Sequence, residues 1–254
     1  MRKIAGGPVL TDEKARQIEV LDVSQDNIQK VLGDRDPITS LRGIQYLKYV
    51  KDLNCRGQEL KTLNLELNSR VERLNCRVNQ LTDLGLDPRG NSLRYLDCSG
   101  NNLTALDLRS NKKLQALQCQ NNRLSWLDLS SNTALDPTKV DCSGNVYDIE
   151  VDRNLQYKVY PDLPCYGATE GTYFTAARAS DWTGGTVSKV DSWDVLTLDN
   201  ARVKEVTYKY DTGNAEIGKV AFTLKTAVPA AYVISSAALT VQSPVEDESA
   251  QIPR

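Results

Sequence analysis

Five cysteines recur along the chain at nearly constant spacing, and thiols in a fixed pattern invite a metal site or disulfides. They are separated by 21, 22, 21 and 23 residues: Cys55, Cys76, Cys98, Cys119 and Cys142. Repeats that stack in register hold these side chains parallel, whereas a disulfide needs Cβ atoms that converge to about 3.8 Å. A linear column also cannot surround one zinc ion tetrahedrally. We therefore predict that these cysteines are reduced, buried and metal-free, and act as small hydrophobes. Cys165 lies outside the pattern and is left unassigned.

Acid–base and nucleophilic catalysis have little support in the sequence. The chain contains no histidine, which is the commonest general base and the usual partner of a nucleophile. Asp97, Asp107, Asp128 and Asp141 occur at fixed repeat positions, so we interpret them as solvated or ladder-forming acids. No glycine-rich phosphate loop precedes a helix, and Gly184-Gly185 lies in a strand and turn context. We predict a protein that is not an enzyme, with no catalytic residue and no cofactor.

The composition is that of an ordinary soluble globular protein. The 254 residues carry 31 basic and 33 acidic side chains, so the bulk charge does not favour nucleic acid or an anionic membrane. No run of about 18 apolar residues occurs, which predicts no transmembrane span. The first residues, MRKIAGGPVLTDEK, lack the apolar stretch of a secretory signal. Either the protein is intracellular or a signal peptide has been removed.

The cysteines belong to a longer repeating frame, L-x-x-L-x-C-x-x-N-x-L. One copy is Leu93, Leu96, Cys98, Asn101 and Leu103, and a weaker echo begins at residue 18. Each unit supplies one short strand and a return segment that cannot bury its apolar side alone, so stacking must bury it. The asparagines are expected to satisfy backbone groups between units. Where Gln58 and Arg89 replace them, we expect looser packing.

Strand alternation places the residues beside each buried Leu and Cys on the outer, concave face of the predicted sheet. Arg and Tyr are enriched at binding hot spots, so this face is the candidate ligand site. Arg56, Arg73 and Arg77 would form a cluster suited to an acidic ligand. An ordinary solvated sheet face is the alternative. The candidate residues are Asp52, Asn54, Arg56, Arg73, Asn75, Arg77, Tyr95, Asp97, Gln118 and Gln120, and Ser99, Ala116, Lys139, Asp141 and Ser143 share the outward positions.

The last third of the chain has the pattern of β structure. Val206–Tyr210 and Val220–Lys225 alternate apolar and polar residues around Thr212-Gly213-Asn214, which predicts a hairpin. Tyr232–Val241 is a third candidate strand, and residues 243–254 are expected to form a flexible tail. The aromatics in this region could form a carbohydrate-stacking platform, but a small domain with few leucines needs them in its core. They are Trp182, Trp193, Tyr208 and Tyr210.

Units such as LDCSGNNLTALDLRSN resemble the bacterial surface leucine-rich-repeat proteins of the internalin-like type, in their cysteine-bearing variant. Leu41–Leu47 resembles the element by which those proteins enter their repeats, and Thr11–Ser24 resembles their helical cap. Residues 29–37 are an insertion relative to that pattern, and residues 179–187 and 206–211 resemble a closing β-rich segment. The resemblance covers residues 11–226.

The repeats and the resemblance together predict an α/β-type repeat solenoid dominated by β, with a leucine-rich-repeat parallel sheet and an irregular convex side. We expect a short helical N-terminal cap with a first irregular coil over residues 1–49 and repeats over residues 50–148. A small all-β, sandwich-like domain is expected over residues 149–242, followed by a tail over residues 243–254.

The resemblance implies a non-enzymatic, exported binding or adhesion protein of the bacterial surface. Its partner would be a protein or a glycan, with acidic groups if the arginine cluster is used, and no nucleic acid or metal is expected. We expect a monomer. The alternatives are a structural spacer that has no specific ligand and an intracellular scaffold for protein interactions.

Overall fold

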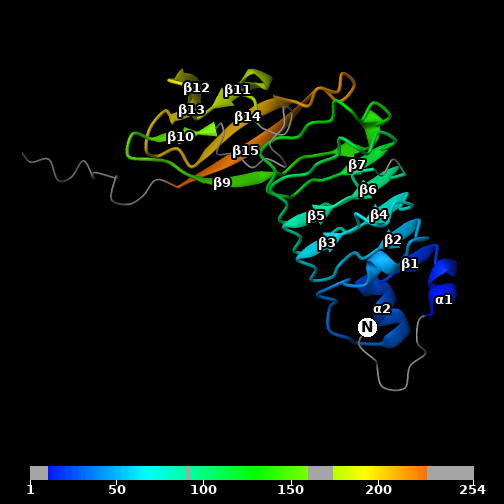
Figure 1. Ribbon diagram of the computed structural model, residues 1–254. Helices are drawn as coiled ribbons and strands as arrows, with labels where there is room; N and C mark the ends of the chain where they lie inside the picture. The colour runs from blue at the N-terminus through cyan, green and yellow to red at the C-terminus, as the bar shows by residue number, and fades with distance from the viewer. Residues whose placement is uncertain (1–10, 90–91, 160–173, 228–254) are drawn as a thin grey trace, which may run out of the picture.

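The computed structural model describes residues 11–89, 92–159 and 174–227, and it is dominated by short β-strands (Figure 1). The first part of the chain holds two helices, two 3-10 turns and a row of repeated strands. A second part is made of antiparallel strands with one parallel edge. The elements of the first part are α1 (Asp12–Gln17), β1 (Val20–Asp22), α2 (Gln25–Leu32), η1 (Ile44–Tyr46), β2 (Asp52–Asn54), β3 (Thr62–Asn64), β4 (Arg73–Asn75), β5 (Asp83–Gly85), β6 (Tyr95–Asp97), β7 (Ala116–Gln118), η2 (Pro137–Lys139) and β8 (Val140–Asp141).

Six of these strands form one sheet in the order β1-β2-β4-β6-β7-β8, and every neighbouring pair is parallel. The register places Leu74 beside Leu53 on one side and Leu96 on the other, one repeat apart each time. All three side chains are fully buried. β1 joins the sheet through Leu21, paired with Leu53, so the echo at residue 18 is confirmed as a strand. The fold is therefore a β-dominated repeat structure whose period comes from a column of buried leucines.

The five repeat cysteines lie in a second buried column, and none forms a disulfide. Backbone hydrogen bonds fix the register of this column, because the amides of Cys55, Cys76 and Cys98 each donate to a carbonyl oxygen of the next repeat. Burial raises the pKa of the Cys55 thiol to about 12 and that of Cys98 further. A contact with Cys142, together with burial, raises the pKa of Cys119. The thiolate, which is the reactive form, is therefore disfavoured at Cys55, Cys98 and Cys119.

We expect the five column cysteines to resist thiol reagents in the native protein, because each is buried and therefore inaccessible to the reagent. The measurement is native-state labelling with a maleimide, followed by mass spectrometry of the peptides. Labelling in denaturant is the control, since all five should then react at once. Prompt labelling of three or more of them without denaturant would contradict the buried column.

Side-chain amides form a ladder beside the cysteines. Nδ2 of Asn79 donates to the carbonyl oxygens of Cys55 and Cys76 at 2.9 and 3.0 Å, and its Oδ1 accepts the amide of Leu60 at 3.0 Å. The expectation of a looser repeat at Gln58 is wrong. Its longer side chain spans the gap to the cap, with Nε2 donating to Val23 O at 2.8 Å and Oε1 accepting the Ile38 amide at 2.6 Å.

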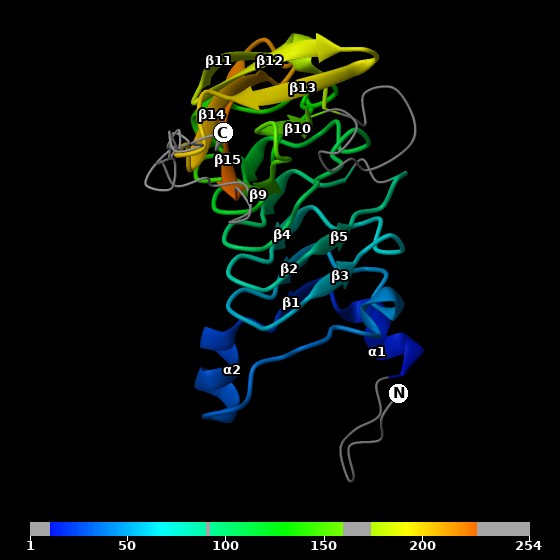
Figure 2. The same cartoon turned by 90° about the vertical axis from the view of Figure 1, so that its left-hand side faces the viewer.

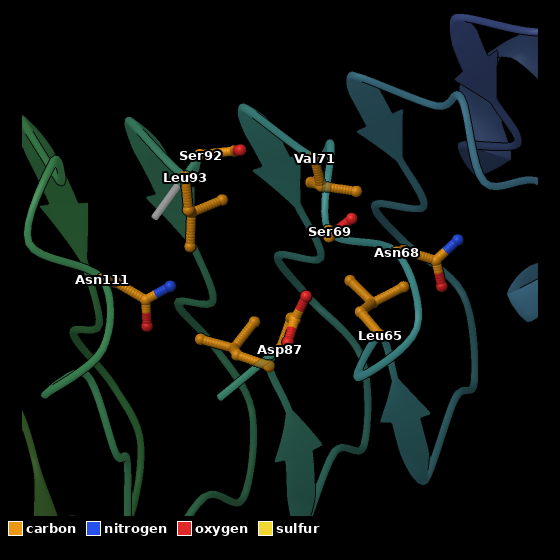
Figure 3. Close-up of a pocket in the computed structure, with 9 residues that line it drawn as sticks. Leu65, Asn68, Ser69, Val71, Asp87, Ser92, Leu93 and Asn111 are labelled. Carbon is orange, nitrogen blue, oxygen red and sulfur yellow. The ribbon is translucent and has the colours of Figure 1, made fainter. Parts of the chain in front are cut away.

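A second ladder runs along the return segments, and Arg89 interrupts it. Nδ2 of Asn132 donates to Leu108 O at 2.9 Å and Asn111 O at 3.0 Å, and Asn68 bonds the preceding turn in the same way. Arg89 instead lies outside and pairs with Asp87 at 3.2 Å. A cavity of about 20 Å³ remains between Asn68 and Asn111 (Figure 3). Arg89 thus interrupts the ladder, as expected, and the volume of the cavity beside Asp87 suits a single water.

The N-terminal cap contains two helices, each started by a hydroxyl side chain. Oγ1 of Thr11 accepts the Lys14 amide at 3.3 Å, and Oγ of Ser24 accepts the Asn27 amide at 3.4 Å. The first helix lies within the segment expected to be a helical cap. The second covers residues 26–28, which fit the end of the repeat frame that begins at residue 18, and it ends before Gly33, which has a positive φ of 73°.

The second part of the chain is built from two further sheets. A four-stranded sheet has the order β11-β14-β15-β9, and a three-stranded antiparallel sheet has the order β10-β13-β12. The predicted hairpin is confirmed as the antiparallel pair of β14 and β15. Tyr232–Val241, residues 243–254 and Cys165 lie outside the described residues. The strands are β9 (Val146–Glu150), β10 (Gln156–Lys158), β11 (Ala179–Thr183), β12 (Gly185–Val190), β13 (Trp193–Leu198), β14 (Glu205–Asp211) and β15 (Lys219–Ala227), with a 3-10 turn η3 (Ala176–Arg178).

Most of the C-terminal aromatics pack inside, as predicted. Tyr208 and Tyr210 are fully buried, and Trp182 stacks on Tyr208 with ring centroids 4.3 Å apart. Phe174 lies edge-on to Tyr208 at 5.9 Å. Trp193 is the exception, since it is 37% exposed and the Lys158 ammonium lies 5.0 Å from its ring centroid. These contacts leave no row of exposed aromatic faces for stacking on a sugar among the described aromatics.

The hairpin loop between β14 and β15 extends the second ladder by one step. Nδ2 of Asn214 donates to Asn132 O at 2.9 Å, which repeats the bond that Asn132 makes to Asn111. Leu129 N donates to Thr212 O at 2.8 Å, and the hydroxyl of Tyr208 donates to Ser125 O. The C-terminal sheets therefore cap the last repeat through the same chemistry that joins the repeats (Figure 1).

Replacing Asn214 with alanine is expected to lower the free energy of unfolding by about 1–3 kcal/mol, because it removes the three hydrogen bonds of a buried side chain. These bonds join Asn214 to Asn132 O and to the amides of Glu216 and Ile217. Urea denaturation measures the change. The matched control is Asn154→Ala at an exposed position, which should alter stability by less than about 0.5 kcal/mol. Equal effects of the two substitutions would show that the ladder does not extend into the hairpin.

Candidate ligand-binding face

The outward residues of the six-stranded sheet lie in rows that run across the strands. Asp52, Arg73 and Tyr95 are consecutive register partners on β2, β4 and β6. Adjacent parallel strands are about 4.8 Å apart, so side chains of one row are within contact distance. Figure 2 shows β1, β2 and β4 side by side, with β3 and β5 on the adjoining flank. The candidate face is defined as the ten predicted residues, namely Asp52, Asn54, Arg56, Arg73, Asn75, Arg77, Tyr95, Asp97, Gln118 and Gln120.

Arg73 links its two row neighbours. Its Nε lies 3.5 Å from Oδ2 of Asp52, and its guanidinium lies 4.9 Å from the ring centroid of Tyr95. Partial burial raises the pKa of the Tyr95 hydroxyl, and Asp97 adds to the rise while Arg73 and Arg77 oppose it. The phenol is therefore a neutral donor and acceptor at physiological pH. The three side chains form a supported, half-exposed platform of carboxylate, guanidinium and ring.

Two of the three arginines of the predicted cluster are paired with carboxylates. NH1 of Arg56 lies 3.2 Å from Oδ2 of Asp26 in α2, so its charge is paired within the cap. Arg73 is paired with Asp52. Arg77 is exposed, and within residues 11–89, 92–159 and 174–227 no carboxylate forms an ion pair with it. The excess positive charge of this end of the face is thus held by Arg77.

Several candidate residues use their side chains to shape the chain rather than to face a ligand. Oδ1 of Asn54, Asn75 and Asp97 accepts the backbone amide two residues later at 3.3, 3.2 and 3.1 Å. The expected exposure of Asp97 is wrong: it is 8% exposed, because its carboxylate also binds the hydroxyl of Ser99 at 2.6 Å. Strand alternation predicts the direction of a side chain but not the turn that follows, and these residues close that turn.

The end of the face formed by β7 and the residues that follow β6 is also less exposed to solvent than expected. Ser99 and Ala116 are buried, which corrects their outward assignment. Nε2 of Gln118 donates to Lys139 O at 3.0 Å, and Gln120 donates to Gln118 at 3.4 Å. The amide oxygen of Gln120 is buried without a partner among the described residues. Ligand contacts are therefore best supported at the end that holds Arg73, Arg77 and Tyr95.

Sequence reasoning missed Val78, which follows Arg77 in the turn after strand β4. Its φ is +54°, and its side chain is 50% exposed. Three of the four equivalent positions in the other repeats, which also have positive φ, are glycines, and the fourth is asparagine: Gly57, Gly100, Asn121 and Gly144. The signal was present in the sequence, because the frame places Gly or Asn two residues after four of the cysteines and Val after one.

Two cavities lie among the described residues outside this face. The small cavity beside Asp87 has room for one water, as described above. A wider groove of about 540 Å³ lies on the flank that bears β3, between residues 40–45 and 62–67. Among the described residues, no group of three His, Cys, Asp or Glu side chains is placed to hold a metal ion. None of the described helices has the length and hydropathy of a membrane span.

By its fold and by the outer surface of its six-stranded sheet, the chain is a β-dominated repeat protein with a polar sheet surface. No family model matches the chain, and no curated protein matches it either. Among solved structures, the chain is similar to the functional domain of InlJ from Listeria monocytogenes, which is described as including a cysteine ladder. The identity is 19% and the TM-score is 0.32, with 87% of this chain and 64% of that chain covered. The chain thus spans less than two thirds of that structure's length.

Proposed function

We propose that the chain is a leucine-rich-repeat solenoid that binds a macromolecular ligand through its concave face and performs no catalysis. The observation that carries the proposal is the exposed Arg77 beside the platform of Asp52, Arg73 and Tyr95. Guanidinium and phenol groups give directional bonds and large contact areas with little loss of side-chain freedom when they are held in advance. Arg73 and Tyr95 are held in this way by each other.

The ligand should present an acidic group. Arg77 has no ion-pair partner among the described residues, so a carboxylate, sulfate or phosphate of the ligand can take both arms of its guanidinium. Asp52 and Asp26 already neutralise the other two arginines. A single acidic group directed at Arg77 fits this arrangement better than a polyanion, and it is compatible with a protein or a glycan.

The resemblance of the repeat units to internalin-like proteins supports an exported, surface-associated protein that acts as a monomer. The principal alternative is a spacer that only holds another module away from a surface. One observation favours that alternative. The side chains of Asn54, Asn75 and Asp97 accept hydrogen bonds from backbone amides of the following turns and are therefore less available to a ligand. If the chain is a binding protein, some substitutions on the face should weaken ligand binding without changing stability. If the chain is a spacer, no substitution should have this effect.

The test is a selection of random linear peptides displayed on phage, run in parallel with a glycan array, against the purified chain. Binding is expected to survive washing at low salt and to yield ligands rich in acidic groups. The negative control is the same chain with Arg73→Glu and Arg77→Glu, which should select different ligands. Enrichment of no peptide and no glycan would support the spacer instead, and identical ligands from both chains would place the binding site away from Arg73 and Arg77.

A further inference from the structure

Val78 is the one β-branched residue among the five that share the left-handed turn position of the repeats. Its φ of +54° crowds the branched side chain against its own backbone, which glycine avoids and asparagine tolerates. The equivalent Gly100 and Asn121 adopt φ of 64° and 55° in the next two repeats. The same turn is therefore made elsewhere in this chain without the strain.

Packing does not offset this strain. Half of the Val78 side chain is exposed, and a Cγ atom lies over Gly100, 3.6 Å from where a Cβ of that residue would be. A valine that served the core would be buried like its repeat neighbour Leu74, which is fully buried. Strained residues that contribute little to packing cluster at binding and catalytic sites.

The surroundings of Val78 point to one kind of partner. Arg77 precedes it directly and holds the unpaired positive charge of the face, and Tyr95 lies one repeat along from Arg73. An exposed branched aliphatic group beside a guanidinium matches a surface that offers an apolar side chain next to a carboxylate. Protein segments carry both groups side by side, whereas a sugar chain offers hydroxyls around its charge.

We propose that Val78 is a ligand-contact residue and that the partner is a protein segment in which an aliphatic or aromatic side chain adjoins Asp or Glu. The acidic group binds Arg77 while the apolar side chain packs on Val78. This inference rests on the proposed function and narrows it to a protein partner. It also explains why one repeat departs from the Gly and Asn of the others.

The test begins with stability, which needs no ligand. Val78→Asn and Val78→Gly are expected to lower the unfolding equilibrium constant, by up to roughly fivefold, because both residues accept the left-handed conformation. Val78→Ile keeps the branched apolar side chain and should leave stability near that of the wild type. A higher unfolding constant for both Val78→Asn and Val78→Gly would show that Val78 is kept for packing, and would overturn the proposal.

The second arm uses the peptides that the unmodified chain selects from a random display library. These peptides should place an apolar residue beside Asp or Glu, and their affinity should fall at least about fivefold for Val78→Asn and Val78→Gly but not for Val78→Ile. Unchanged affinity in Val78→Asn overturns the role of Val78, while a loss in Arg77→Glu in the same assay preserves the proposed function. Selection of glycans but no peptides overturns the protein partner alone, and failure to select either class overturns both.

Discussion

Replacing Leu96 with alanine is expected to lower the free energy of unfolding by about 2–5 kcal/mol. Leu96 is fully buried, and its register partners are Leu74 and Leu117. The substitution loses the transfer free energy of the removed atoms and leaves a cavity between two leucines that stacking holds apart. Because each repeat contacts only its neighbours, the weakening should extend to β4 and β7 before it reaches the ends.

Urea denaturation followed by circular dichroism measures the loss for Leu96→Ala, and amide hydrogen exchange locates it. The matched control is Leu67→Ala, since Leu67 is 57% exposed and should change stability by less than about 0.5 kcal/mol. A loss below about 1 kcal/mol at Leu96 would contradict the buried leucine column. Uniform loss of exchange protection across the C-terminal sheets would contradict the nearest-neighbour account.

The leucine and cysteine columns could be predicted from the sequence because their cause is local and periodic. A strand that buries Leu96 and Cys98 must place both on one side, and a period of 21 to 23 residues brings each repeat back to that side. The β14–β15 hairpin was predictable for the same reason, since alternation and turn residues specify it. Each of these features requires only the residues of one unit and its copies.

The second helix of the cap, and the ion pairs and burial of the side chains on the face, could not be predicted in this way. Helix α2 covers residues 26–28, which also fit the repeat frame, and its contacts with Arg56, after the end of β2, are not visible in the local sequence pattern. The pairing of Arg56 with Asp26 joins residues 30 positions apart across that unforeseen helix. Asp97 turned inward because Ser99 supplies a hydroxyl at the right distance, which strand alternation does not describe.

Reversing two charges on the face should weaken ligand binding at least about tenfold, or about 1.4 kcal/mol. Arg73→Glu with Arg77→Glu replaces an unpaired guanidinium by a carboxylate and removes the support of Tyr95. The loss should appear mainly as slower association, because exposed charges steer the encounter. Binding by the unmodified chain should also fall as salt rises, since salt screens exposed charges.

Surface plasmon resonance with a selected acidic peptide gives both rate constants. Arg73→Glu places a carboxylate beside Asp52, so thermal unfolding must first show that the double variant is folded. Arg77→Glu alone disturbs no ion pair among the described residues and should retain most of the effect. The control is Lys112→Glu with Lys113→Glu, the same charge change at two exposed positions between the strands β6 and β7. An equal loss in this control would mean that net charge, and not the face, governs binding.

The most direct test of the proposed binding face is hydroxyl-radical footprinting of the chain with and without a bound selected peptide. Tyrosine and tryptophan react readily, and the chain offers Tyr95 on the face, Tyr46 in the cap and Trp193 in the C-terminal sheets. Tyr46 and Trp193 are 61% and 37% exposed, so both report on the rest of the surface. The bound peptide is expected to protect Tyr95 and to leave the reactivity of Tyr46 and Trp193 unchanged. Protection of Trp193 or Tyr46 with Tyr95 still reactive would contradict this expectation.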